Sequence, residues 1–577
     1  MKSLCSFAAC ILLVAYVSAS AARSDGAQAT AAPENAKQES VPVFRINASL
    51  VAIDVVAEDK AGNPVLDLKP EDINVFEDKQ PRPIKRMVLE RPGGDDTVRY
   101  EAFQKQLKQI VDQLPAGASS NLSALSTAAA PASSIILFDD LNTPFEAKAY
   151  ARKEMLKMLQ QVPPGQPVAV YGLSASLHLL QDFTRDLSAL QSAVSQAAHA
   201  QTPISRLREG DIDHSASDAI VAGPGSKDMV SELQAFEFEE SAQKLDVRVR
   251  ITADALVSLA RRMESVPGRK NLIWVSGGFP IELMPDVDSV SALDMHRYDN
   301  VIAEVAAALE NARVSVYPVD ANGLDTAPVY DASNKGSFTN RSFGSQLNSW
   351  SAQNVSAHQA MSDIAQRTGG RAFFNRNDLG RAAITAMQDG GTYYAVLFAP
   401  ASEQADGRFH ALKLTTSRKD VKLHYRQGYF ALDPKQPDKD RQKHMADEIG
   451  QVLGSPQLAT GIILTAMPHP NTDSINMVIG ASTLTYAQAD DGLYHTDFEL
   501  ATALFDAKGK LLSGKSDVIR TSYRPDGVRK ILREGMPIVV NLPAGVNATR
   551  VRLVVRDIPS DRIGSVDVAF VPQNAAK

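Results

Sequence analysis

Cysteine is almost absent from this chain of 577 residues, and both cysteines, Cys5 and Cys10, lie within the first ten positions. We expect those positions to belong to a secretory signal that is removed, so that the mature chain contains no cysteine. This excludes disulfides, thiol nucleophiles, zinc fingers and iron–sulfur clusters. Burial of an apolar core is then the expected source of stability in an oxidising compartment.

The N-terminus has the layout of a signal peptide over residues 1–21. Lys2 gives a positive start, residues 4–17 are mainly apolar, and Ala19-Ser20-Ala21 matches the small-x-small cleavage pattern. The apolar run is shorter than the roughly 20 residues that a membrane-spanning helix needs. The sequence therefore predicts an exported protein of the periplasm, the outer envelope or the medium, with no transmembrane anchor in the mature chain.

The chain also lacks a basic stripe. Its formal net charge is -7, and loss of Lys2 with the signal makes it one unit more negative. A nucleic-acid partner is not expected from this charge pattern. The length predicts several domains, because a domain usually takes about 100–200 residues.

Strands alternate with helices from residue 133 onward, which predicts a mostly parallel sheet covered by helices. Residues 134–138 form an unbroken apolar run, as expected for a strand buried on both faces. Further strands are predicted at 167–173, 177–180, 271–276 and 314–319, with a sixth at 371–374. Polar insertions at 200–245 and 325–352 are longer than ordinary connections.

β-strand patterns lie on both sides of this α/β region. The strands predicted within residues 41–92 are too few to close a sandwich, and we expect those of 392–432 to complete it. About seven short strands in 457–577 fit a small immunoglobulin-like β-sandwich. The expected organisation is a signal peptide at 1–21, a linker at 22–40, a β segment at 41–92, a linker with a helix at 93–132, an α/β domain at 133–391, a β segment at 392–432, a connector helix at 433–456 and a C-terminal sandwich at 457–577.

Six phrases in this order resemble one family. They are Val65-Leu66-Asp67-Leu68-Lys69-Pro70-Glu71-Asp72 with Val75-Phe76-Glu77-Asp78, Phe138-Asp139-Asp140-Leu141-Asn142-Thr143, Pro267-Gly268-Arg269-Lys270-Asn271-Leu272-Ile273-Trp274-Val275-Ser276-Gly277-Gly278-Phe279-Pro280, Tyr317-Pro318-Val319-Asp320, Thr368-Gly369-Gly370-Arg371 and Tyr425-Arg426-Gln427-Gly428-Tyr429. Together they resemble the secreted bacterial "VWFA-related" family first named from acidobacteria, over about residues 44–430. The resemblance implies export and a doubly wound, Rossmann-like von Willebrand factor A (VWA) domain, but no known activity.

VWA domains usually hold a divalent cation at a metal-ion-dependent adhesion site, at the carboxyl ends of the strands. The usual ligands are an Asp-x-Ser-x-Ser sequence after the first strand, a Thr on a second loop and an Asp after the fourth strand. Here Asp139 matches the first Asp and Thr143 the second Ser, but Leu141 stands at the first Ser and Gly277 at the last Asp. The resemblance therefore implies a degenerate site.

Three further residues are candidate ligands. Thr252 is the candidate for the Thr, and Asp140 and Asp320 are candidates to compensate for the lost oxygens. Mg²⁺ or another divalent cation, which prefers oxygen ligands, is the only cofactor considered. A different reading of Thr143 is that it caps the following helix, since Thr143-Pro144-Phe145-Glu146 has the capping-box pattern.

Catalytic motifs are missing: the sequence contains no His-Glu-x-x-His, no Gly-x-Ser-x-Gly and no phosphate-binding loop. Asp211-Ile212-Asp213-His214 lies in a polar insertion without a partner motif, and we interpret it as a solvated loop. The sequence therefore favours a binding protein of the cell envelope with a protein partner, and not an enzyme. Two alternatives stay open: an envelope hydrolase that uses the acidic loop residues, and a purely structural component without metal.

Overall fold

The computed structural model describes residues 50–570 apart from several gaps. The positions outside the description within that span are 92–94, 129, 131, 163–164, 197–225, 265, 279–298, 325–339, 402–407, 432–448, 451, 455–457, 470–471, 490–491, 544–545 and 561. The predicted signal peptide, the linker at 22–40 and most of the connector at 433–456 therefore lie outside the described residues. No helix within the described ranges has the length and apolarity to cross a membrane.

The chain is a mixed α/β protein in which most strand pairings are antiparallel. Among the described strands, parallel pairing is found in one five-stranded sheet, in the order β10-β9-β6-β7-β8, of which β8 alone runs antiparallel. β7 and β8 are joined by a turn too short for a crossover, so β8 must run back along β7. The bounds are β6 (Ala132–Asp139), β7 (Val168–Leu173), β8 (Leu177–Thr184), β9 (Arg269–Ser276) and β10 (Val314–Asp320).

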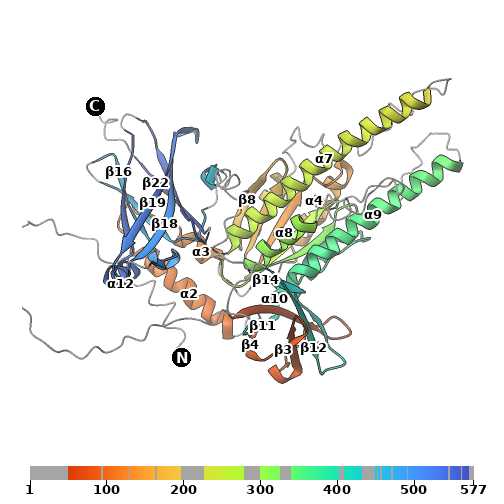
Figure 1. The fold of residues 1–577 in the computed structure, drawn as a ribbon, viewed down its shortest axis with the longest axis horizontal. Helices are drawn as coiled ribbons and strands as arrows, with labels where there is room; N and C mark the ends of the chain where they lie inside the picture. The colour runs from red at the N-terminus through yellow and green to blue at the C-terminus, as the bar shows by residue number, and fades with distance from the viewer. Residues whose placement is uncertain are drawn as a thin grey trace, which may run out of the picture.

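Helices cover both faces of this central sheet (Figure 1). Alternate residues of β6 point to opposite faces, as the pleat requires. Ile135 and Leu137 join one apolar cluster, and Ile136 and Phe138 join the other. The first cluster includes residues of α7 (Ser226–Met263), α8 (Asp299–Asn311) and α9 (Asn340–Thr368), and the second includes residues of α4 (Phe145–Leu159), α5 (Leu187–Gln196) and α10 (Leu379–Gly391).

Two of these helices continue well past the carboxyl ends of the strands (Figure 1). Arg248 of α7 contacts the loop after β6, and His358 of α9 contacts the last residue of β10. At about 1.5 Å per residue, the part of α7 before Arg248 is ~33 Å long and the part of α9 before His358 is ~27 Å long. The two segments predicted as polar insertions, 200–245 and 325–352, therefore each end in a helix.

Strands from 51–90 pair with strands from 393–430 in two four-stranded antiparallel sheets. Their orders are β13-β1-β11-β4 and β14-β12-β2-β3. The two sheets share one apolar cluster, which contains Ile53, Val75 and Val396. The bounds are β1 (Val51–Glu58), β2 (Ile73–Glu77), β3 (Gln80–Arg82), β4 (Ile84–Glu90), β11 (Tyr393–Phe398), β12 (Phe409–Thr416), β13 (Lys422–His424) and β14 (Gly428–Phe430), with a 3-10 turn at η1 (Pro70–Asp72).

This two-sheet unit meets the central α/β unit through charged side chains. Arg313, just before β10, pairs with Asp54 of β1 at 2.5 Å. Arg426 lies 3.8 Å from Glu310 of α8 and also donates to the Ala52 carbonyl. Burial raises the pKa of Glu310 to about 8. The contact is therefore polar and partly buried.

The C-terminal region contains two further antiparallel sheets around a third apolar core. One has the order β20-β16-β15-β5, and the other contains β17, β18, β21 and β22, with β19 paired to β18. The bounds are β15 (Leu464–Pro468), β16 (Ser474–Ile479), β17 (Ala487–Gln488), β18 (Tyr494–Phe505), β19 (Leu511–Tyr523), β20 (Met536–Asn541), β21 (Arg550–Asp557) and β22 (Ile563–Ala569), with η4 (Ala481–Thr483) and α12 (Pro525–Glu534) between them.

Two local expectations differ from the structure. Residues 371–374 do not form a strand; only Phe373 bridges Val319 of β10, in parallel register. Residues 93–132, predicted as a linker with one helix, contain α2 (Asp95–Asp112), β5 (Ser119–Ser120) and α3 (Leu122–Ala128). β5 pairs with β15, and Asn121 inserts its side chain into the C-terminal sheet by bonding to the Ala459, Ile462 and Leu464 backbones.

Candidate functional site

The loop after β6 holds the first candidate residues. Asp139 is the last residue of β6, which lies in the middle of the central sheet, and its side chain is 2 % exposed. The next two backbone amides, of Asp140 and Leu141, both donate to the Leu173 carbonyl at the end of β7. The loop is therefore fixed to the neighbouring strand before it enters α4.

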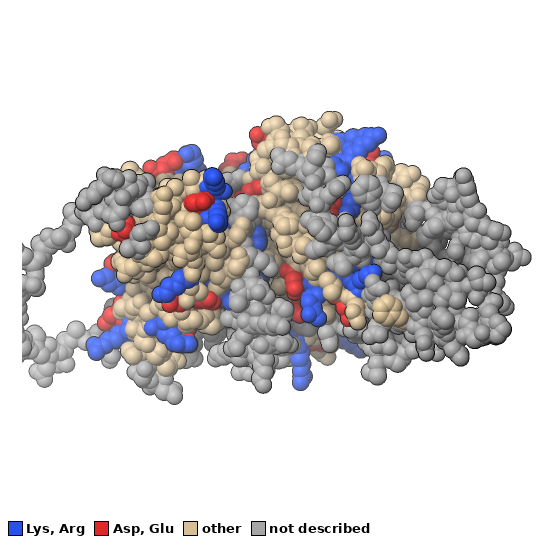
Figure 2. Space-filling model, turned by 90° about the horizontal axis from the view of Figure 1, so that it is seen from above, with Lys and Arg blue, Asp and Glu red and all other residues tan. Residues whose placement is uncertain are grey.

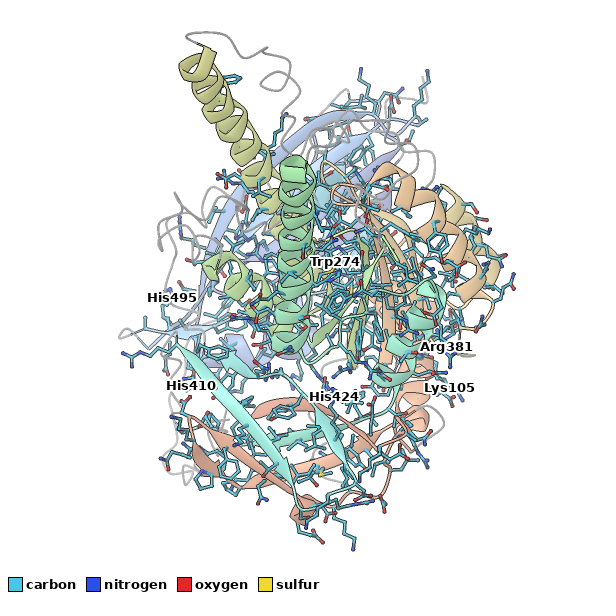
Figure 3. All side chains as sticks on the ribbon, turned by 90° about the vertical axis from the view of Figure 1, so that its right-hand side faces the viewer. Lys105, Trp274, Arg381, His410, His424 and His495 are labelled. Atoms are coloured by element: carbon cyan, nitrogen blue, oxygen red, sulfur yellow. The ribbon has the colours of Figure 1, made fainter. Side chains whose placement is uncertain are left out.

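Four donor groups of the protein surround the Asp139 carboxylate. Oδ1 accepts the backbone N–H of Asn142 at 2.9 Å. Oδ2 accepts the Asn142 amide at 2.9 Å, the Trp274 indole N–H at 3.0 Å and the Ser276 hydroxyl at 2.8 Å. Burial raises the pKa of Asp139, and these hydrogen bonds offset part of that effect. Figure 3 shows Trp274 deep within the side chains of the central unit.

Asn142 links this carboxylate to the second loop. Its amide Nδ2 donates to Asp139 and, at 2.9 Å, to Thr252 Oγ1, while its Oδ1 accepts from Arg248 Nε at 3.3 Å. The Thr252 hydroxyl donates in turn to the Arg248 carbonyl of the preceding turn of α7. The structure thus brings Asp139 and Thr252 together, with Asn142 between them.

Thr143 also faces this cluster, and the helix-capping interpretation of it is wrong. α4 begins at Phe145 with Pro144 as its N-cap residue and without a capping side chain. The Thr143 hydroxyl instead accepts the backbone N–H of Gly277 at 3.0 Å. Thr143 therefore joins the loop after β6 to the end of β9.

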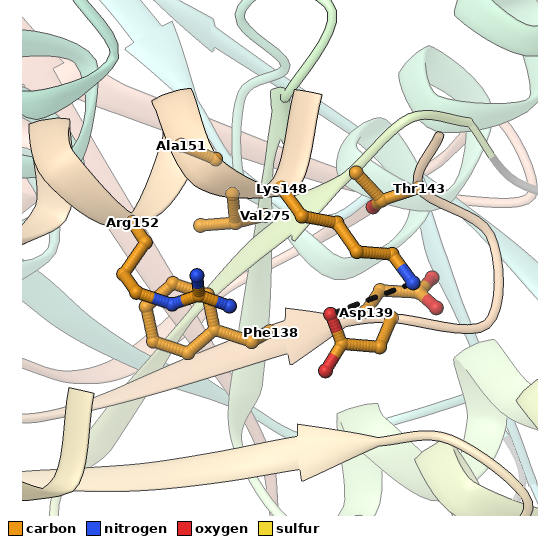
Figure 4. A pocket seen from close by; sticks show the side chains of 8 residues that line it. Phe138, Asp139, Thr143, Lys148, Ala151, Arg152 and Val275 are labelled. Carbon is orange, nitrogen blue, oxygen red and sulfur yellow. Dashed lines mark ion pairs between the residues drawn. The ribbon is translucent and has the colours of Figure 1, made fainter. Parts of the chain in front are cut away.

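Asp140 lines a small pocket beside α4 together with Asp139, Thr143 and Lys148, of which Figure 4 labels the last three. Lys148 Nζ lies 3.8 Å from Asp140 Oδ1, and Arg152 lines the same pocket. Burial raises the pKa of Asp140 to about 6, against the opposing effect of Lys148. The charge of Asp139 also raises the pKa of Asp140, so the two neighbouring carboxyls share one pocket while only Asp139 accepts the hydrogen bonds described above.

Asp320 ends β10, which is the next strand beyond β9. Its Oδ2 lies 2.9 Å from His358 Nε2, and its Oδ1 accepts the Asn322 backbone N–H at 2.9 Å. His358 stacks on Phe374 with ring centroids 4.4 Å apart. Asp320 is therefore paired with a histidine of α9 and makes no recorded contact with Asp139.

These surroundings do not fit a divalent cation. A hard cation needs about six oxygen ligands, and the side-chain oxygens of Asp139, Thr143 and Thr252 already accept hydrogen bonds from donors of the protein. Leu141 is buried in the apolar core, and Gly277 has no side chain to contribute. Within the described ranges no group of three or more His, Cys, Asp or Glu residues is arranged to hold a metal.

Sequence reasoning missed the residues that organise this site, namely Asn142, Trp274, Ser276 and Arg248. Asn142 lies within the same phrase as Asp139 and Thr143, and Trp274 and Ser276 lie within the strand that was predicted before Gly277. A polar side chain flanked by candidate ligands was the available signal. Asn142 and Arg248 lie far apart in the sequence, so their contact could not be predicted from local patterns.

The strand order provides the strongest observation about fold. Taking β6 as strand 1, the sheet order read from β8 is 3-2-1-4-5, strand 3 is antiparallel, and Phe373 adds a parallel bridge beyond strand 5. Asp139 then follows strand 1 at the carboxyl edge, where open α/β sheets bind ligands.

Comparisons with known proteins find similar folds only. No family model and no curated protein sequence matches the chain. An aerotolerance-related membrane protein from Bacteroides fragilis is 12% identical, with a TM-score of 0.24, over 45% of this chain and 98% of its own. A von Willebrand factor type A structure from Catenulispora acidiphila is 10% identical, with a TM-score of 0.21, over 56% and 72%.

A pilus adhesin, SpaC from Lactobacillus rhamnosus GG, covers more of the chain. It is 9% identical, with a TM-score of 0.23, over 77% of this chain and 54% of the adhesin. The assignment of the central unit therefore depends on its own strand order and on the geometry of its loops.

Proposed function

We propose that the central unit is a doubly wound VWA domain flanked by β-sandwich units, and that this exported chain is an interaction protein without catalytic activity. Its partner, a protein, docks at the carboxyl edge of the central sheet. We call this surface the rim: the loop 139–143, the ends of β9 and β10, and the parts of α7 and α9 beyond them. The observation that carries the proposal is the 3-2-1-4-5 sheet order with Asp139 at the rim.

Exposed apolar side chains support the rim as a docking surface. Leu324, after β10, is 60% exposed and Val355 of α9 is 62% exposed, and Phe236 and Val247 of α7 are exposed too. A partner that covers these side chains would bury their apolar surface, which favours association. The helices that carry them present a long surface at little loss of conformational freedom, because they are already ordered.

The charge distribution favours a protein partner over a nucleic acid. Figure 2 shows Lys and Arg interspersed with Asp and Glu on the visible face, without a broad basic area. Nucleic-acid binding needs clustered positive charge to neutralise phosphates. A partner with a mixed polar and apolar surface matches this face better.

A pair of matched double variants tests the proposed docking surface. Leu324→Glu with Val355→Glu places charge on the rim, and Val518→Glu with Val539→Glu does the same at exposed positions of the C-terminal sheets. The tagged chain is cross-linked in an envelope extract of its own organism, and the captured proteins are compared. We expect the rim variant to lose a specific partner that the control keeps. Equal capture by both variants would contradict the rim as the docking surface.

A further inference from the structure

We propose that the rim works without a divalent cation, because neutral donors of the protein take the place of the cation at Asp139. This inference rests on the VWA assignment proposed above and deepens it: recognition at the rim is then independent of metal. The inference depends on the direction of the hydrogen bonds. A lone pair of an oxygen that accepts a hydrogen bond cannot bind a cation at the same time.

Two of the donors have only one possible role. The Trp274 indole Nε1 and the Asn142 backbone N each carry a hydrogen and no free lone pair. They lie 3.0 Å and 2.9 Å from the two oxygens of Asp139. A cation bound at either oxygen would face a positively polarised hydrogen. Trp274 is fully buried and packs in the core, so it cannot move aside without opening the domain.

The third donor is held in orientation by a charged neighbour. Arg248 Nε donates to Asn142 Oδ1, which directs the Nδ2 group of Asn142 toward Asp139 and Thr252. A rotated amide would place its oxygen against the Asp139 carboxylate and its NH₂ group against the guanidinium, and both contacts would be repulsive. Thr252 therefore also offers its lone pair to an amide and not to an ion.

The two positions that would have to restore ligands cannot do so. Leu141 is 2 % exposed within the larger apolar cluster of the central unit. The Thr143 hydroxyl oxygen accepts the Gly277 backbone N–H. This oxygen is therefore engaged in a hydrogen bond, as those of Asp139 and Thr252 are. Asp139 Oδ2 accepts three donors and Oδ1 accepts one, and with two hydroxyls that also accept hydrogen bonds they form a connected polar network. Such a network fixes the loop in one conformation.

Asp139 is accordingly a positioning residue of the recognition loop. It ties β6, β9 and, through Asn142, α7 into one unit, so that the rim is formed before the partner arrives. Chelators and divalent cations should then leave partner binding unchanged. This differs from the cation-dependent capture of a ligand carboxylate that the sequence resemblance implied.

Manganese titration of the fluorine-labelled chain tests the inference. The sequence has two tryptophans, Trp274 and Trp350, so incorporation of 5-fluorotryptophan gives two ¹⁹F signals that a Trp274→Phe variant assigns. Mn²⁺ at Asp139 would lie next to the Trp274 ring and broaden its signal strongly. We expect no selective, saturable broadening of the Trp274 signal up to 10 mM Mn²⁺ (roughly tenfold above the weakest metal affinities common in proteins).

The controls separate this site from the surface. Saturable broadening of Trp274 that disappears in Asp139→Asn would overturn the inference, while broadening that persists in that variant comes from another place and leaves it standing. Isothermal titration of the unlabelled chain with Mg²⁺ and Mn²⁺ gives the same decision if Asp139→Asn does not fold. No partner is needed for either measurement, so a failed docking surface and a failed metal inference give different results.

Discussion

The Trp274 indole donates a hydrogen bond to Asp139 across a sequence separation of 135 residues, at 3.0 Å and out of contact with water. The bond joins the end of β6 to β9 at the edge where ligands of open α/β sheets bind. An indole N–H at that place ties the acidic residue to the core of the domain. This hydrogen bond and the three others to the same carboxylate hold the loop after β6 in place at the rim.

Removal of the Asp139 carboxylate should destabilise the protein. Asp139→Ala leaves the Trp274, Ser276 and Asn142 donors buried without their acceptor, and we expect a loss of about 3 kcal/mol in the free energy of unfolding. Urea unfolding of the purified chain measures it. Asp140→Ala is the matched control, because Asp140 is the adjacent carboxyl in the same pocket but is not an acceptor in this network. Equal midpoints for wild type and Asp139→Ala would refute the role given to Asp139.

Thr143 should act through its hydroxyl and not through helix capping. Thr143→Ala removes the acceptor of the Gly277 N–H, and we expect a loss of about 1 kcal/mol. Thr143→Ser keeps the hydroxyl and should restore most of the stability. Both values come from thermal and urea unfolding at pH 7. If Thr143→Ser were as unstable as Thr143→Ala, the methyl packing of Thr143 would be its contribution instead.

Glu310 should give stability a dependence on pH. Burial raises its pKa to about 8 in the folded chain, above the ordinary value of 4.5. The folded state therefore holds a proton that the unfolded state has lost between about pH 4.5 and 8, and stability falls as the pH rises through that window. Glu310→Gln removes this dependence.

The comparison with the Glu310→Gln variant uses unfolding at pH 5 and at pH 8. We expect the variant to gain stability relative to wild type on going to pH 8, by roughly 3.5 kcal/mol. Arg426 and Arg367 act on Glu310 in the opposite direction, because their positive charge favours the ionised carboxylate. A difference between variant and wild type that does not change with pH would show that Glu310 has an ordinary pKa.

The ion pair between Asp54 and Arg313 should couple the two-sheet unit to the central unit. Asp54→Ala leaves the Arg313 guanidinium without its partner, and we expect a loss of about 2 kcal/mol, since Arg313 is partly in contact with solvent. The double variant Asp54→Ala, Arg313→Ala should recover part of that loss. A double-mutant cycle of urea midpoints measures the coupling, and additive losses would show that the two side chains act independently.

Local patterns predicted the elements whose burial is uniform along the chain. The apolar run at 134–138 predicted the strand that the structure places at Ala132–Asp139, because a strand buried on both faces needs apolar residues at every position. The strand predicted at 271–276 is likewise found, at Arg269–Ser276, and is buried at every position. The sequence also favoured a mixed α/β class, and the structure confirms it.

Contacts between segments far apart in the chain could not be predicted from local sequence patterns. β5 is only two residues long, and its strand character comes from β15, more than 340 positions away, and not from its own propensity. The helix α12 was missed between two predicted strands. Residues 371–374 have strand-forming residues but only one backbone bridge.

The candidate site was partly predictable for the same reason. The family resemblance assigned Asp139, Thr143 and Thr252 to one site, and the structure brings them together. Their partners could not be predicted. The sequence pattern at Thr143 predicts that its hydroxyl caps the following helix. In the folded chain the hydroxyl accepts the Gly277 amide N–H instead, a contact that local sequence does not reveal.

Anomalous diffraction from crystals soaked in MnCl₂ tests the central claim most directly. The map is calculated at the manganese edge and inspected around the two carboxylate oxygens of Asp139, with the indole of Trp274 as the reference. The donor network leads us to expect no anomalous peak within coordination distance of Asp139 and an unchanged Trp274 side chain. A peak bonded to Asp139, with the Asn142 amide turned away from it, would contradict the account.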